Sequence, residues 1–231
     1  AGSDELRMRI LGFMSNFLSS ALKDNSSLDF AVVTGVMQIA KASIFSGVNN
    51  LYVNSVFDSG FDEFWGFTEE EVRALCADSG DASKFEEAKE WYDGYRFGNA
   101  DVYNPWSVLN YIQSGFVPKP YWSNTSTNSI LNRLLARADM ASMKRLMDLE
   151  GEGIRERLLP SISYEEADAI ENSLYSVMAM TGYLKASPEG DDLYRLSIPN
   201  SEIRILMARK LEFLVRFDSG PYQDFCNAVL E

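Results

Sequence analysis

The chain has 231 residues, with 34 acidic and 21 basic side chains, a net charge of −13 and no histidine. Without histidine, a catalytic triad or a zinc site that needs this residue is excluded. Its two cysteines, Cys76 and Cys226, are too few for a disulfide scaffold or a four-cysteine zinc site. Hydrophobic residues make up 46 % of the chain, which is typical of a protein with a folded core.

Apolar residues recur at helical spacing in the first segment, which predicts a helix from about Asp4 to Lys23. Polar residues then break the pattern. Phe30–Val33 is a short, unbroken apolar run that ends at Thr34 and Gly35. Such a run is typical of a strand buried on both faces of a parallel sheet.

Helix-start signals divide the middle of the chain. Capping boxes at Thr68–Glu71 and Ser83–Glu86 predict two helices, because a hydroxyl and a glutamate satisfy free backbone N–H groups reciprocally. Asn104 followed by proline predicts a third, which should run to Ser114 and be closed by Gly115.

The second half of the chain contains further signals for helices and one for a hairpin. We expect short helices over 130–138 and 141–149, and then a capping box at Ser163–Glu166 that opens a helix to Thr181. A hairpin over 184–198 and a long amphipathic helix after Asn200 follow. The proline-rich stretch 116–120 is the best candidate boundary, which gives domains 1–115 and 116–231.

Negative charge is concentrated in residues 58–93, which hold 12 acidic and 3 basic side chains. This surface would repel phosphate backbones, so we expect no direct contact with nucleic acid. We interpret it as a solvated face, with a docking face for a basic partner as the alternative. The sequence has no apolar run long enough to span a membrane and no visible signal peptide, so we expect a cytoplasmic protein.

Motifs for ATP hydrolysis are absent from the sequence. There is no G-x-x-x-x-G-K-[ST] loop to hold phosphates. The triplet Glu87–Lys89, with Asp81 upstream, imitates a nuclease metal signature, but it lies inside a predicted helix rather than on adjoining strands. We therefore expect no enzymatic activity and no cofactor for this chain alone.

Seven ordered blocks across the chain resemble the AAA-ATPase-like proteins that usually carry a C-terminal PD-(D/E)XK nuclease domain. The blocks are 33–51, 66–72, 91–97, 102–109, 121–125, 181–184 and 196–203. The resemblance implies the middle of such a protein, with the phosphate-binding loop before Ala1 and the nuclease after Glu231. The implied fold is mainly α with few strands (α+β): a remnant of a P-loop α/β core, a helical lid, and a winged-helix-like part over 163–217.

The same resemblance suggests nucleotide-sensing residues for the intact protein. Thr34 ends the predicted strand, where AAA-type ATPases place a polar residue that senses the γ-phosphate or the attacking water. The alternative is a Thr-Gly pair that only turns the chain. Lys41 and Ser43 are further candidates for contact with nucleotide phosphate, against a solvated lysine and a capping serine. ATP and magnesium are thus expected in the intact protein.

Asp93, Tyr95 and Arg96 lie in an aromatic-rich block around Gly94. We interpret this block either as a helix C-cap whose aromatic rings pack on the next element, or as a surface between ATPase core and lid. The predicted function is a non-catalytic part of an AAA-ATPase-like protein that supplies sensor and lid elements. Its partners would be the ATPase and nuclease domains of that protein. The alternative is a free-standing acidic module that binds a protein partner and no nucleotide.

Overall fold

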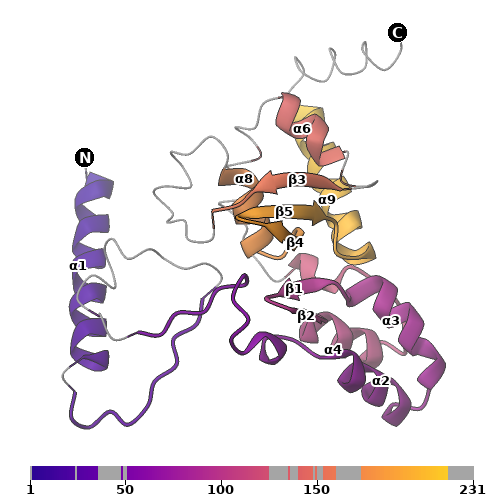
Figure 1. Cartoon of the computed structure of the whole chain (residues 1–231), viewed down its shortest axis with the longest axis horizontal. Coiled ribbons are helices and arrows are strands. Elements are labelled where there is room, and N and C mark those ends of the chain that lie inside the picture. The colour runs from indigo at the N-terminus through magenta and orange to yellow at the C-terminus, as the bar shows by residue number, and fades with distance from the viewer. Residues whose placement is uncertain are drawn as a thin grey trace.

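The computed structural model describes residues 2–23, 25–35, 48, 51–124, 135, 140–147, 149, 153–159 and 173–217. These residues form helices and small antiparallel sheets, so the predicted α+β class is confirmed. Two groups of elements follow the N-terminal helix α1 (Figure 1). These elements alone do not show the predicted P-loop remnant or the predicted winged-helix-like part.

Helix α1 (Gly2–Leu22) confirms the first predicted helix and stands apart from the other helices in Figure 1. Five large apolar side chains on it are more than half exposed, namely Leu6, Met8, Ile10, Phe13 and Phe17. All but Met8 lie on one face of the helix, because they are spaced by four, three and four residues. An apolar stripe of this kind normally faces a core.

The predicted strand Phe30–Val33 is wrong for the structure as described. Residues 28–35 have no regular secondary structure. Phe30 is 82 % exposed and Val32 69 %. A strand buried on both faces needs neighbouring strands to pair its backbone groups, and no described strand pairs with this segment.

The first group of elements, which we call the helical module, spans residues 69–124. A buried cluster holds its helices together, with the fully enclosed side chains Val72, Phe85, Tyr92, Val108 and Tyr111 at its centre. The elements are α2 (Glu69–Asp78), η2 (Ala82–Lys84), α3 (Phe85–Tyr92), β1 (Tyr95–Phe97), β2 (Ala100–Val102), α4 (Pro105–Gln113) and η3 (Tyr121–Asn124).

Two of the three helix starts predicted between residues 68 and 105 are capped as the sequence signals indicate. Thr68 and Glu71 form the predicted capping box, and Asn104 caps α4 with Pro105 at the first helical position. The predicted box at Ser83 is wrong. Asp81 caps η2 instead, because its carboxylate accepts from the Ser83 N–H at 3.0 Å and α3 starts directly from that 3₁₀ turn.

The second group, which we call the sheet module, is built on a three-stranded antiparallel sheet in the order β3-β5-β4. The predicted hairpin is confirmed as β4–β5, while β3 had no clear sequence signal. Eighteen buried residues from strands and helices form its core. The elements are α6 (Met140–Met147), β3 (Ile154–Arg157), α8 (Ser173–Met180), β4 (Lys185–Gly190), β5 (Leu193–Ser197) and α9 (Ser201–Phe217).

Some predictions fall on residues that the structure does not describe. The capping box at Ser163–Glu166 and most of the predicted helix over 130–138 lie outside the described residues. The predicted division after residue 115 stays a prediction. Phe116 and Tyr121 pack on the helical module, whereas Trp122 packs on the sheet module, with its ring 5.1 Å from that of Tyr183.

Candidate functional site

The two modules meet where α3 ends and α9 begins. Asn200 caps α9, since its side-chain oxygen accepts from the Ile203 N–H at 3.0 Å. The same side chain donates through Nδ2 to the Asp93 carbonyl at 2.7 Å. Gly94 follows with φ +89°, and a Cβ built on it would lie 2.5 Å from the Pro199 carbonyl oxygen. One amide thus starts a helix and joins it to the other module.

Glu202 is the centre of this junction and is completely buried. Its carboxyl accepts from the Ser107 hydroxyl of α4 and from the Trp122 N–H of η3, each at 2.8 Å. Burial raises the pKa of Glu202, and these hydrogen bonds act in the opposite direction. The carboxyl therefore ties α9 to two elements of the helical module, and it is not accessible to a substrate.

Ion pairs cover one edge of the junction. Lys185 on β4 contacts the Asp101 carboxylate of β2 at 2.8 Å, and Arg96 contacts the same carboxylate at 3.3 Å. Arg96 also donates to the Gly98 carbonyl at 3.2 Å. Asp101 is thus shared between a cation from each module. Exposed pairs of this kind contribute about 0–1 kcal/mol each.

Three buried polar atoms near the junction have no hydrogen-bond partner among the described residues: Asp93 Oδ1, Tyr95 Oη and Tyr103 Oη. Burial raises the pKa of Asp93 and of both tyrosines. The Tyr95 ring packs close to Gly182, where a Cβ would lie 3.3 Å from Cε1. The junction is suited to holding the two modules in a fixed relation.

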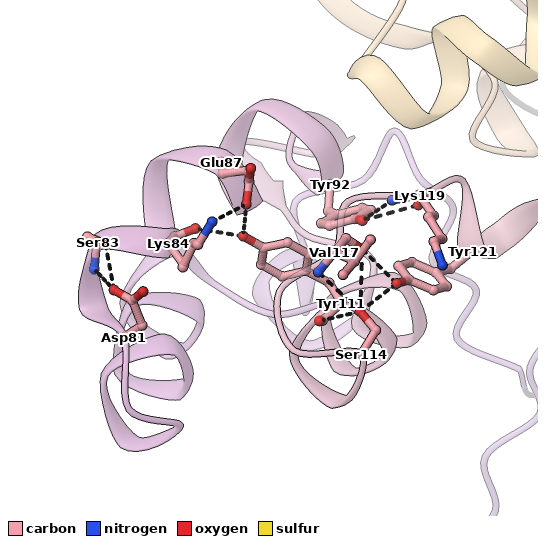
Figure 2. A network of polar contacts seen from close by, with 10 residues as sticks. All are labelled: Asp81, Ser83, Lys84, Glu87, Tyr92, Tyr111, Ser114, Val117, Lys119 and Tyr121. Atoms are coloured by element: carbon pink, nitrogen blue, oxygen red, sulfur yellow. Dashed lines mark hydrogen bonds and ion pairs between the residues drawn. The ribbon is translucent and has the colours of Figure 1, made fainter.

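Tyrosines hold the loop that leads from α4 to the junction (Figure 2). Tyr92 both accepts from the Lys119 N–H and donates to its carbonyl, at 3.1 Å each. Tyr121 donates to the Val117 carbonyl at 2.7 Å. Tyr111 donates to the Glu87 carboxylate, which lowers the pKa of Glu87. These bonds position η3, and with it the N–H that contacts Glu202.

The predicted site residues fall in three places. Asp93, Tyr95 and Arg96 all lie at the junction. Thr34 lies on the exposed irregular segment. Lys41 and Ser43 lie outside the described residues. Of the three predicted nucleotide-sensing residues, the described part of the chain thus contains Thr34 alone, and their common role stays a prediction.

No sequence signal marks Glu202, Ser107 or Asn200 as partners across the two modules. In the sequence, Glu202 is indistinguishable from other acidic residues in the first turn of a helix, and Asn200 from other helix N-caps. Their partners lie 95 and 107 residues away in the sequence.

The described residues contain no group of three or more aspartate, glutamate or cysteine side chains that could hold a metal ion. Among the described helices, none has the length and apolar character needed to cross a membrane.

The comparison with known proteins gives one relative. The chain is 32 % identical over 211 residues to an uncharacterized protein in the vnfD 5′ region of Azotobacter chroococcum mcd 1. The aligned part covers 88 % of this chain but 38 % of that protein, so the chain spans well under half of its relative. No family model and no solved structure matches the chain.

Proposed function

We propose that this chain is a non-catalytic part of an AAA-ATPase-like protein, in which it supplies sensor and lid elements to a nucleotide-binding core. The support from the sequence is the seven ordered blocks. In the intact protein, ATP and magnesium would be held mainly by residues outside this chain. The proposed setting is the cytoplasm.

The observation that carries the proposal is the exposed apolar surface of the N-terminal part. Leu6, Ile10, Phe13 and Phe17 form a stripe on α1, and Phe30 and Val32 follow on the irregular segment, all more than half exposed. Burying one such side chain contributes about 1.5–3 kcal/mol. Exposed surface of this kind marks an interaction site. A core sheet, with Phe30–Val33 as one of its strands, would cover both parts.

The relative is long enough to contain such a core, since the aligned part is 38 % of its length. In open α/β sheets, ligands bind at the carboxyl ends of the strands. Thr34 follows directly after Phe30–Val33, which is the place for a residue that senses nucleotide. The junction at Glu202 would then fix the sheet module on the helical module as one lid.

A second candidate function is an acidic module that binds a protein partner and no nucleotide. The observation that favours it is the charge of residues 58–93, which contain 12 acidic side chains and only 3 basic ones. Both functions predict that the chain alone does not bind ATP. They differ in what happens to Phe30–Val33 when the preceding part of the reading frame is present.

The test is hydrogen exchange of residues 28–35 in this chain and in a longer version that adds the preceding residues of the same reading frame. We expect fast exchange in the chain alone and strong protection in the longer protein, because the segment joins a sheet. Unchanged fast exchange in the longer protein would refute the core-sheet proposal and favour the acidic module.

Thr34→Val in the longer protein tests the sensor role itself. The substitution keeps the β-branch and removes the hydroxyl. Loss of one hydrogen bond to a charged partner costs about 1.5–3 kcal/mol, which corresponds to a fall in ATPase rate of roughly 10- to 150-fold. Ser27→Ala, which removes an exposed hydroxyl from the preceding turn, is the control and should leave the rate unchanged. An unchanged rate for Thr34→Val would show that Thr34 only ends the strand.

A further inference from the structure

Four exposed aromatic side chains gather around the 3₁₀ turn η1 (Asp62–Phe64), and we call this surface the η1 patch. Its members are Tyr52, Phe61, Phe64 and Trp65, which are between 43 % and 80 % exposed. The rings of Phe61 and Phe64 contact edge to face at 6.3 Å. The Tyr52 hydroxyl lies next to Gly60, 3.4 Å from the place of a Cβ there.

The backbone beneath the η1 patch is held on both sides. Asn99 in the β1–β2 turn donates its N–H to the Asp62 carboxylate at 3.0 Å. Gly98 donates to the Val56 carbonyl at 2.9 Å. Phe67 pairs with Tyr103 in an isolated antiparallel bridge. The aromatic rings therefore project from a fixed scaffold, so a partner would not have to order this loop when it binds.

Phe61 adopts a left-handed backbone conformation, with φ 60° and ψ 26°. This conformation is unfavourable for a bulky residue. It persists only where the surroundings impose it, and such residues cluster at binding sites and active sites. The ring of the residue in this conformation is 59 % exposed.

Residues 52–71 contain six acidic side chains and no basic one. Four of the six already have partners, because Asp58, Asp62, Glu69 and Glu71 accept hydrogen bonds within the chain. Glu63 and Glu70 are exposed and have no hydrogen bond or ion pair in the described part of the chain. Aromatic anchors with two exposed carboxylates within a few residues of them in the sequence favour a partner that is apolar and positively charged.

We propose that the η1 patch is the docking surface for a basic amphipathic helix of another protein. The apolar face of that helix covers Phe61, Phe64 and Trp65, while its lysine or arginine residues approach Glu63 and Glu70. This inference goes beyond the first proposed function, deepens the second candidate, on whose acidic residues it rests, and does not depend on nucleotide binding. The six acidic side chains of residues 52–71 would repel nucleic acid and anionic lipid. A segment of another protein is therefore the occupant that this charge favours.

The experiment measures binding of a fluorescein-labelled amphipathic helical peptide of leucine and lysine to the full chain by anisotropy. A peptide of the same pattern with glutamate in place of lysine is the charge control. We expect the lysine peptide to bind and the glutamate peptide not to bind. Phe64→Ser should weaken binding by at least about tenfold, as the loss of an interface anchor does.

Two further variants separate docking from other effects. Leu109→Ser removes an exposed apolar side chain from α4, outside the η1 patch, and should leave the affinity within about twofold. Phe61→Gly suits the left-handed backbone, so it should weaken binding without lowering the thermal midpoint. Equal binding of both peptides, or unchanged binding to Phe64→Ser, overturns the proposal. Greater loss with Leu109→Ser assigns the peptide to α4 and also overturns it.

Discussion

Gly94→Ala tests the junction at the point where the two modules approach most closely. Alanine at φ +89° costs about 1–2 kcal/mol for the left-handed backbone. Its Cβ would also lie 2.5 Å from the Pro199 carbonyl oxygen, so the backbone must move. This movement weakens the bond from Asn200 to the Asp93 carbonyl, which contributes about 1 kcal/mol. We expect a total destabilisation of about 3 kcal/mol.

Two other glycines isolate the contact from the backbone conformation. Gly80 has φ +101° and Gly115 has φ +76°, and a Cβ on either would meet no atom within 4 Å. Alanine at Gly80 or Gly115 should lower the free energy of unfolding only by the cost of the left-handed backbone, about 1–2 kcal/mol. Gly94→Ala should exceed the loss of both controls by about 1–2 kcal/mol. In thermal unfolding followed by circular dichroism it should therefore melt lower than either by roughly 2–8 °C, at about 2–4 °C per kcal/mol. Equal midpoints for the three variants would refute the close approach at Pro199.

Two more predictions concern the buried carboxyl and the first described cap. Because burial raises the pKa of Glu202, the folded chain binds more protons at this residue than the unfolded chain, and the stability of the wild type should fall as pH rises above the ordinary glutamate value. Glu202→Gln should lack this component of the pH dependence when the free energy of unfolding is measured by denaturant titration from about pH 4 to 8. If the free energy of unfolding changes with pH equally in both proteins, the raised pKa of Glu202 is contradicted. Thr68→Ala should lower the free energy of unfolding by about 1 kcal/mol, whereas Thr68→Ser should nearly preserve it; equal losses would rule out the hydroxyl cap.

Elements with local signals could be predicted from the sequence. The Thr68 capping box, the Asn104–Pro105 helix start and the hairpin over 184–198 depend on residues within a few positions of each other. At Ser83 two local signals compete. The Asp81 carboxylate accepts a hydrogen bond from the Ser83 N–H and caps the 3₁₀ turn η2. The chain is therefore already helical at Ser83, and the predicted capping box does not form.

Features that depend on distant residues could not be predicted. Nothing near Glu202 indicates that its carboxyl contacts Ser107, and β3 becomes a strand only through its pairing with β5. Phe30–Val33 fails in the opposite way. Its composition suits a buried strand, but a strand requires neighbours, and the described residues provide none.

The double use of Asn200 has a consequence for the order of folding. Every hydrogen bond that joins the modules through residues 200–202 spans at least 80 residues of sequence. The helical module closes over much shorter separations, up to 27 residues for the tyrosine bonds to Lys84 and Lys119. During synthesis the first module can fold while α9 is still inside the ribosome, because domains fold as units from the N-terminus. Asn200, which caps α9, also makes one of the contacts that join the two modules over the longest sequence separations. The start of α9 and the docking of the modules should therefore form in one step.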